Sequence, residues 1–358
     1  MPTPAMVLAP GMFRDVHAKV AHGLVRGSSR FDIVGVIDAS CAGQDAGEVL
    51  DGRVRGIPLF ASIAECLQTV ATPVEVCILG IATHGGRFTD EVRGWLLEAI
   101  DQGLGVINGL HDSLQGDAEI AAAGAARGVS LVDVRRLRKS SQLRFWTGAI
   151  QQVRAPRIAV LGTDCAIGKR TTTFLLVEAL RQSGVRAEMI YTGQTGWMQG
   201  ARFGLILDST LNDYVGGEIE RAVVECQREA NPEVMILECQ SALRNPFGPC
   251  GSELLLSAAA SGVILQHAPG RKYFEGYEDL QVEIPSLQSE IELLRLYGVP
   301  VVAVSLNGEG LDDQALQQVQ QHAREELQIP VVRVLEEGIE PLVDATRDFL
   351  ATAAEARS

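Results

Sequence analysis

Short apolar runs alternate with helix-like stretches along the first 134 residues of the chain. The runs predict strands at residues 5–8, 33–37, 74–81, 105–107 and 129–132, and the stretches between them predict helices over 13–24, 63–69, 90–101 and 118–127. Uninterrupted apolar strands that alternate with helices are typical of a parallel sheet covered on both faces. Residues 9–12 read Ala-Pro-Gly-Met, so the first helix lacks the Gly-x-Gly-x-x-Gly opening of a dinucleotide site. We therefore predict a Rossmann-like α/β domain over residues 1–134 that has no standard dinucleotide site.

The same alternation resumes at residue 157 and continues to the last residue, 358. Apolar runs predict strands at 158–161, 187–191, 234–237, 262–265, 301–305 and 331–334, and helices follow from 174, over 213–230, and from 312 and 341. We predict a second doubly wound α/β domain over 157–358. Residues 135–156 form the boundary, and seven basic residues but no acidic one lie between 135 and 157. This stretch reads as a solvated linker and as a cationic wall that attracts anionic ligands, two compatible readings, and Arg144-Phe145-Trp146 hints that part of it packs.

A glycine-rich loop follows the first strand of the second domain. Ile158 to Leu161 is apolar, Gly162 opens the loop, Gly168-Lys169 closes it, and a helical stretch follows. Strand, glycine loop, lysine and helix in this order predict a P-loop NTPase-like domain, in which backbone N–H groups and the lysine hold phosphate. Five residues separate the glycines where the usual motif has four, and an arginine follows the lysine. The predicted phosphate-binding residues are Gly162, Thr163, Asp164, Cys165, Gly168, Lys169, Arg170, Thr171 and Thr172.

Two later strand ends carry residues with candidate roles around this loop. Glu238 ends the apolar run 234–237, where a carboxylate faces Mg²⁺ in phosphate-loop proteins, and Thr171 is the candidate second ligand. Gln194 and Thr195 lie between two glycines after the run 187–191. That arrangement suits the close approach of a polar substrate, and a plain turn is the alternative.

Three more candidates follow the run 262–265 in the sequence Gln-His-Ala-Pro-Gly-Arg-Lys. His267 is a candidate general base, although a lone histidine at a strand end is often structural. Arg271 and Lys272 are candidates for holding substrate carboxylates.

Composition and charge argue against several classes of protein and of binding partner. The net charge of −14 argues against a general nucleic-acid binder. No apolar run approaches the roughly 18 residues of a membrane span. The seven cysteines are scattered without a Cys-x-x-Cys pair, which indicates a reduced cytoplasmic protein without a zinc site. We expect a small-molecule substrate and neither a nucleic-acid nor a membrane partner, and we leave a homo-oligomer open.

Several motifs together resemble a known family. The loop Gly-Thr-Asp-Cys-Ala-Ile-Gly-Lys is similar to the long phosphate loop of dethiobiotin synthetase and the cobyric acid synthase relatives. Over nearly its full length the chain resembles a two-domain bacterial family, long listed as of unknown function, that includes D-glutamate N-acetyltransferase. The resemblance rests on segments 35–38, 45–50, 109–112, 132–136, 162–172, 192–196 and 265–272. It implies an acetyl-CoA-dependent transferase acting on an amino acid such as D-glutamate, with Glu238 and Gln240 beside His267 in the catalytic site.

The segment after the acidic strand departs from the family pattern. Relatives usually carry Glu-Gly-Gln-Gly-Ser, whereas this chain has Glu-Cys-Gln-Ser-Ala at 238–242. Since both glycines are replaced, we expect the segment to lose free access to positive φ angles. Two other hypotheses remain beside acyl transfer. In one, ATP and Mg²⁺ on the phosphate loop activate a carboxylate, as in the synthetases. In the other, the protein binds a nucleotide without catalysis.

Overall fold

The computed structural model describes residues 1–82 and 84–355. The chain forms two compact units, one of Met1–Leu137 with Gln194–Gly200 and the other of Arg138–Gly193 with Ala201–Ser358. The sequence pattern predicts domain boundaries at 134 and 157 and therefore places residues 194–200 in the second domain. The structure differs because this short segment packs into the first unit. There Gln199 Nε2 donates to Gly23 O at 2.9 Å, and Met198 is fully buried in the first core.

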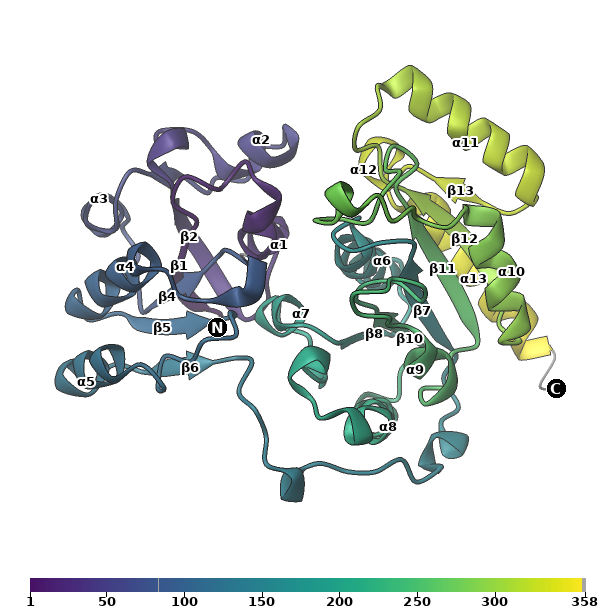
Figure 1. Ribbon diagram of the computed structural model, residues 1–358, viewed down its shortest axis with the longest axis horizontal. Helices are drawn as coiled ribbons and strands as arrows, with labels where there is room; N and C mark the ends of the chain where they lie inside the picture. The colour runs from purple at the N-terminus through teal and green to yellow at the C-terminus, as the bar shows by residue number, and fades with distance from the viewer. Residues whose placement is uncertain (83, 356–358) are drawn as a thin grey trace. The chain divides into compact units, whose positions relative to one another are not determined.

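The first unit is built on one parallel sheet of six strands, in the order β3-β2-β1-β4-β5-β6 (Figure 1). This is the strand order of dinucleotide-binding folds, which confirms the predicted Rossmann-like domain. The strands are β1 (Thr3–Leu8), β2 (Phe31–Ile37), β3 (Leu59–Phe60), β4 (Val76–Leu79), β5 (Gly105–Asn108) and β6 (Leu131–Asp133). The helices are α1 (Lys19–Arg26), α2 (Ala46–Asp51), α3 (Ile63–Thr69), α4 (Asp90–Asp101), α5 (Ala118–Arg127) and α7 (Gln194–Met198).

The second unit holds a parallel sheet of seven strands, in the order β13-β12-β11-β7-β10-β8-β9. The strands are β7 (Arg157–Gly162), β8 (Ala187–Tyr191), β9 (Phe203–Gly204), β10 (Val234–Glu238), β11 (Gly262–His267), β12 (Val301–Leu306) and β13 (Val331–Val332). The helices are α6 (Lys169–Gln182), α8 (Asn212–Ala230), α9 (Ser252–Leu256), α10 (Leu287–Leu296), α11 (Asp313–Leu327), α12 (Val334–Glu337) and α13 (Glu340–Glu355).

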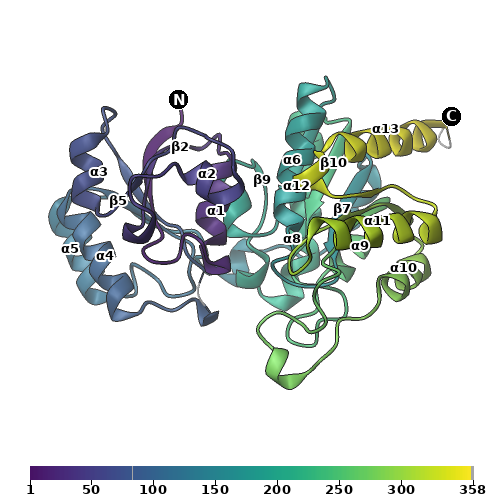
Figure 2. The same cartoon turned by 90° about the horizontal axis from the view of Figure 1, so that it is seen from above.

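Alternate residues of the central strand β7 supply two separate cores. Ile158 and Val160 pack with buried residues of α6 and α13, whereas Ala159 and Leu161 pack with those of α8, α9, α10 and α11. The side-chain period of two in a strand produces this division, so an apolar strand with no polar face is buried between two helical layers. The two layers can be followed from above in Figure 2. The predicted doubly wound domain is confirmed.

The basic stretch after the first unit is packed, because two buried acids of α8 hold it. Glu218 Oε1 accepts the Arg144 backbone N–H at 3.0 Å, and its Oε2 lies 2.5 Å from Arg138 Nη1. Glu220 accepts the backbone N–H groups of Thr147 at 2.7 Å and Ile150 at 3.1 Å. The segment packs, as Arg144-Phe145-Trp146 hinted, since several of its backbone donors and part of its charge are taken up within the second unit, and its role as a cationic wall stays a prediction.

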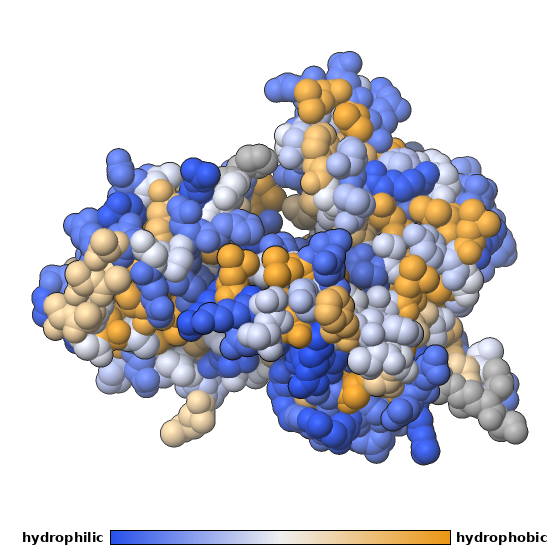
Figure 3. Space-filling model, turned by 60° about the horizontal axis from the view of Figure 1, so that its bottom comes forward, coloured by the Kyte–Doolittle hydropathy of each residue, from blue (hydrophilic) through white to orange (hydrophobic). Residues whose placement is uncertain are grey.

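Some large apolar side chains remain exposed on the surface of the protein. On the face drawn in Figure 3 they gather in several separate groups among hydrophilic ones. Within residues 1–82 and 84–355, every helix is too short or too polar to cross a bilayer.

Candidate functional site

The carboxyl ends of four neighbouring strands in the second unit converge on one site. The loop after β7 begins at Gly162, Glu238 ends β10, Thr192 follows β8, and His267 ends β11. Thr163 Oγ1 lies 3.0 Å from His267 Nδ1, and the Thr192 backbone N–H donates to Glu238 Oε2 at 3.2 Å. Ligands of parallel α/β sheets bind at this edge.

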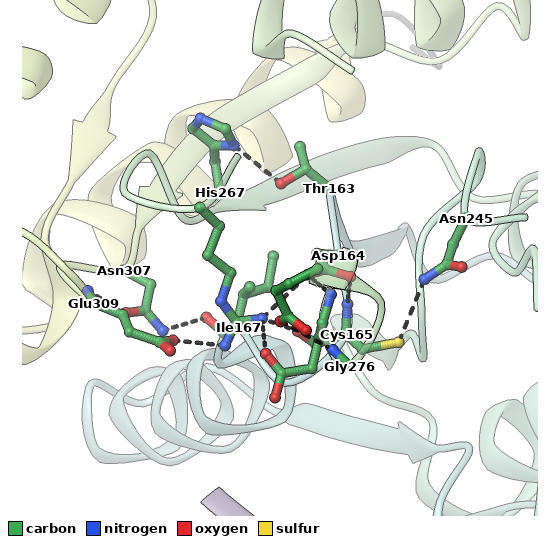
Figure 4. A network of polar contacts seen from close by, with 12 residues as sticks. Thr163, Asp164, Cys165, Ile167, Asn245, His267, Gly276, Asn307 and Glu309 are labelled. Carbon is green, nitrogen blue, oxygen red and sulfur yellow. Dashed lines mark hydrogen bonds and ion pairs between the residues drawn. The ribbon is translucent and has the colours of Figure 1, made fainter. Parts of the chain in front are cut away.

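Three backbone carbonyls of the phosphate loop accept hydrogen bonds from side chains, one from the loop's own lysine and two from residues outside it (Figure 4). Lys169 Nζ donates to the Asp164 carbonyl, Arg271 Nη1 to that of Cys165 at 2.9 Å, and Asn307 Nδ2 to that of Ile167 at 2.9 Å. Two loop N–H groups are also engaged, since that of Thr163 donates to the Gln266 carbonyl at 3.1 Å and that of Cys165 donates to Asp164 Oδ1 at 2.6 Å, and the remaining loop N–H groups are the candidates for binding an anion.

The start of α6 completes this anion-binding geometry. Gly168, at φ +104°, is the N-cap residue and makes no side-chain capping bond, so the first N–H groups of a 14-residue helix lack a side-chain cap. Ala166 has φ +52°, a left-handed conformation of the kind that anion-binding backbone nests contain. Helix N-termini of this kind bind phosphate. Gly162 is required for packing, since a Cβ there would lie 2.8 Å from Lys169 Cδ.

Two of the three threonines at the start of α6 have structural partners. Thr172 Oγ1 donates to Gln266 Oε1 at 2.7 Å, and Thr173 Oγ1 donates to the Lys169 carbonyl at 2.8 Å. Within the described part of the chain, the Thr171 hydroxyl forms no such bond. Thr171 therefore stays the candidate metal ligand of this segment, and Thr172 fixes the helix to β11.

Arg271 belongs to a buried clamp beneath the phosphate loop. Its guanidinium lies 3.1 Å from Asp164 Oδ2, 2.9 Å from Glu275 Oε2 and 2.6 Å from Glu309 Oε2. Lys272 is exposed and lies 3.1 Å from Glu283 Oε1. Both positive charges face carboxylates of the protein itself, so the arrangement favours a structural role for Arg271, and the role of the pair in holding substrate carboxylates stays a prediction.

Glu238 is an acidic residue of the site whose pKa lies near neutral pH. Its side chain is buried, and burial raises its pKa to about 7, against the opposing effects of Arg170, the Thr192 N–H and Lys169. A carboxyl group that is half protonated at neutral pH can accept or release a proton during a reaction.

Burial also shifts the pKa of His267, but downward. Burial lowers its pKa to about 4, so the imidazole is neutral at physiological pH. A group whose conjugate acid is this strong is a weak proton acceptor, and its bond to Thr163 fixes the loop. The structure therefore disfavours His267 as the general base.

The altered segment after β10 keeps one left-handed residue despite the loss of glycine. Ser241 has φ +42°, whereas Cys239 is not among the residues with positive φ. Ser241 adopts this conformation at an energetic cost that glycine would not carry, which agrees with the expectation that the segment has no free access to positive φ angles. Gln240 Nε2 donates to the Thr192 carbonyl at 2.6 Å, which holds Gln240 against the segment that follows β8.

Gln194 and Thr195 lie in the first unit, whereas the sequence pattern placed them in the second domain. They begin the short helix α7, which belongs to the first unit, and both are buried. Gln194 Oε1 accepts from Arg135 Nη2 at 3.0 Å, and Arg135 Nε donates to the Gly109 carbonyl at 2.7 Å. The plain-turn alternative is wrong because these residues are helical, and their role in substrate binding stays a prediction.

Two asparagines contact the phosphate loop: Asn245, which begins a proline- and glycine-rich loop of a kind that commonly carries function, and Asn307, which was not predicted. Asn307 follows β12 and bonds to Ile167 O, and Asn245 Nδ2 lies 3.7 Å from Cys165 Sγ. Asn307 follows an apolar strand directly, which is the signal that identified Glu238, so the same rule would have found it.

Comparisons with known proteins agree with this architecture. Residues 144–343 match the P-loop domain described as DUF1611, a domain of unknown function, and residues 39–137 match its Rossmann-like N-terminal domain. A crystal structure of a DUF1611 family protein from Anabaena variabilis is 29% identical and superposes with a TM-score of 0.85, covering 97% of this chain and 99% of that one.

Two relatives carry the name D-glutamate N-acetyltransferase. The protein from a Pseudoalteromonas species is 24% identical over 81% of this chain and 87% of its own length. The protein from Tritonibacter scottomollicae is 26% identical over 78% of this chain and 83% of its own length. The family resemblance drawn from the motifs is thereby confirmed, and the chain belongs to the DUF1611 family of proteins with a Rossmann-like N-terminal domain and a P-loop C-terminal domain.

Proposed function

We propose that this protein is an acyl-CoA-dependent N-acetyltransferase that acts on the amine of an amino acid such as D-glutamate. The observation that carries the proposal is the phosphate loop, which has three carbonyls held by side chains and a helix N-terminus without a side-chain cap. The two relatives named D-glutamate N-acetyltransferase support the choice of reaction.

The loop residues fit the phosphate groups of acetyl-CoA. Its pyrophosphate and its ribose 3′-phosphate are both anions that N–H groups and a lysine can bind without hydrolysis. Lys169, Gly168 and the first turn of α6 would hold one of these groups. When bound, acetyl-CoA supplies an acetyl group activated as a thioester.

Glu238 would act as the proton acceptor in this reaction. An amino-acid amine must lose a proton before it can attack a carbonyl carbon, and a carboxylate with a pKa near 7 is suited to taking it.

A specific feature also supports Mg-ATP on the same loop. Glu238 ends the strand next to β7, and Thr171 has no hydrogen-bonding side-chain partner in the described residues, which suits two ligands of a metal ion. ATP-dependent carboxylate activation of the dethiobiotin synthetase type, or nucleotide binding without catalysis, would follow from that occupancy.

Titration calorimetry with acetyl-CoA and with Mg-ATP, followed by mass analysis of D-glutamate incubated with each, separates these functions. We expect heat from acetyl-CoA and a product heavier by one acetyl group. The absence of both would reject acyl transfer. Magnesium-dependent ATP binding that is lost in Glu238→Gln would favour the alternative.

The role of the loop itself is tested by removing its lysine. Lys169→Ala should weaken acetyl-CoA binding by at least ~1.5 kcal/mol, the lower end for a charge-assisted hydrogen bond. Lys139→Ala is the matched control, because Lys139 is an exposed lysine of the same unit. Equal affinities in the two variants would remove the loop from the binding site.

A further inference from the structure

Two cysteine thiols lie against each other beside the candidate site. Cys239 directly follows Glu238, and its Sγ is 3.7 Å from Sγ of Cys250. Both side chains are almost fully buried, with 3% and 6% of their surface exposed. The remaining five cysteines form no such pair in the described residues.

Each thiol of the pair donates a hydrogen bond to an oxygen atom, and these bonds offer the thiol protons a path away from the sulfurs. Cys250 Sγ donates to Glu253 Oε1 at 2.9 Å, and Cys239 Sγ donates to the Gln240 carbonyl at 3.0 Å. The contact with Cys239 and burial raise the pKa of the Cys250 thiol. The thiol form therefore dominates at neutral pH, and we expect a slow reaction with oxidants.

The ten residues between the two cysteines belong to the site. Gln240 donates to the Thr192 carbonyl, and Asn245 Nδ2 lies 3.7 Å from Cys165 Sγ in the phosphate loop. The Cys250 N–H donates to the Ala242 carbonyl at 3.0 Å, which holds the two ends of the segment together. A bond between the two sulfurs would close this segment into a covalent ring.

We propose that Cys239 and Cys250 form a disulfide under hydrogen peroxide and that this bond reduces ligand binding at the phosphate loop. One sulfur attacks a peroxide oxygen, breaks the O–O bond and becomes a sulfenic acid as one water leaves. The other sulfur then attacks the sulfenic sulfur, forms the S–S bond and releases a second water. The two thiols lose two electrons and two protons, and peroxide takes them up as two waters.

Geometry explains why the bond would affect the site. The sulfurs must approach from 3.7 Å to about 2.05 Å, so Cys239, Cys250 or both must move. Cys239 is covalently joined to Glu238 and Gln240, so its movement shifts the carboxyl group and the amide of the site. The effect on ligand binding rests on the proposed phosphate grip, whereas formation of the bond does not.

The experiment treats the reduced full-length protein with hydrogen peroxide, maps disulfides by peptide mass analysis and titrates both forms with pyrophosphate. We expect a mass loss of about 2 Da, an S–S link between the peptides of Cys239 and Cys250, and pyrophosphate affinity at least fivefold weaker. Dithiothreitol should restore both. Cys250→Ala should abolish the link and the change in affinity, whereas Cys226→Ser, which alters a buried thiol in α8, should retain both.

Three outcomes would overturn the inference. One is the absence of the link, another is a link to Cys165 instead, and the third is a link without a change in pyrophosphate affinity. If the reduced protein itself binds no pyrophosphate, the proposed phosphate grip fails, while the mass analysis still decides whether the disulfide forms.

Discussion

Replacing Arg271 with leucine tests whether this arginine braces the phosphate loop or binds substrate. Asp164 has no exposed surface, and the Arg271 side chain is 10% exposed. In Arg271→Leu, Asp164 would keep the backbone N–H groups of Cys165 and Glu275 but lose its buried cation. Removal of one partner of a buried ion pair costs about 3–5 kcal/mol.

The expected loss is large enough to be measured in two ways. At the lower end, about 3 kcal/mol corresponds to a decrease in melting temperature of roughly 6–12 °C for a unit of this size. The variant also loses the donor to the Cys165 carbonyl, so the loop should loosen and pyrophosphate affinity should fall. Urea unfolding and titration calorimetry measure the two effects.

Two further variants make the result decisive. Arg186→Leu removes a surface arginine whose partner Glu233 is also exposed, and it should change the stability by less than about 1 kcal/mol. Adding Asp164→Asn to Arg271→Leu should recover part of the loss, because the uncompensated buried charge is gone. If Arg271→Leu kept its stability and only the KM for the amino acid rose, the bracing role would be refuted and the substrate role restored.

Three other changes probe separate features. Ser241→Gly should raise the free energy of unfolding by about 1 kcal/mol, since φ +42° strains serine but not glycine, and an unchanged urea midpoint would contradict this. Burial raises the pKa of Glu238 from 4.5 to about 7, so its contribution to stability is complete below pH 4.5 and is lost as the pH rises through 7. Glu238→Gln should therefore gain up to about 3 kcal/mol relative to the natural protein between pH 5 and 8, and parallel pH curves in urea unfolding would disprove the raised pKa. Glu220→Ala should accelerate hydrogen exchange at the Thr147 and Ile150 amides by at least about tenfold, whereas equal rates would show that Glu220 does not hold the segment.

Apolar patterning predicted the sheets because both faces of each sheet are covered. The strand 187–191 and the helices 63–69, 90–101 and 118–127 have the predicted bounds. The two-residue strands β3 and β9 and the short helices α2 and α9 escaped prediction, because so few residues show no period. The first helix begins at Lys19 rather than 13, since a 3₁₀ turn capped by Asp15 precedes it.

Site residues were predictable where their chemistry depends on neighbours in sequence. The phosphate loop depends on consecutive residues, so its spacing indicated it, and Glu238 was identified by its position at a strand end. The partners of Arg271 and the environment of His267 come from distant segments. Glu309 is 38 residues from Arg271 and Thr163 is 104 residues from His267, so neither the neutralised charge nor the lowered pKa can be read from local sequence.

The segment Gln194–Gly200 has a consequence for the order in which the protein folds during synthesis. Met198 fills the core of the first unit, yet the ribosome makes residues 138–193 before it reaches this segment. At 5–20 residues per second, this delay lasts roughly 3–11 s. The first unit therefore completes its core only after the phosphate loop has been synthesised, and a single cut in the chain cannot separate the two units as intact modules.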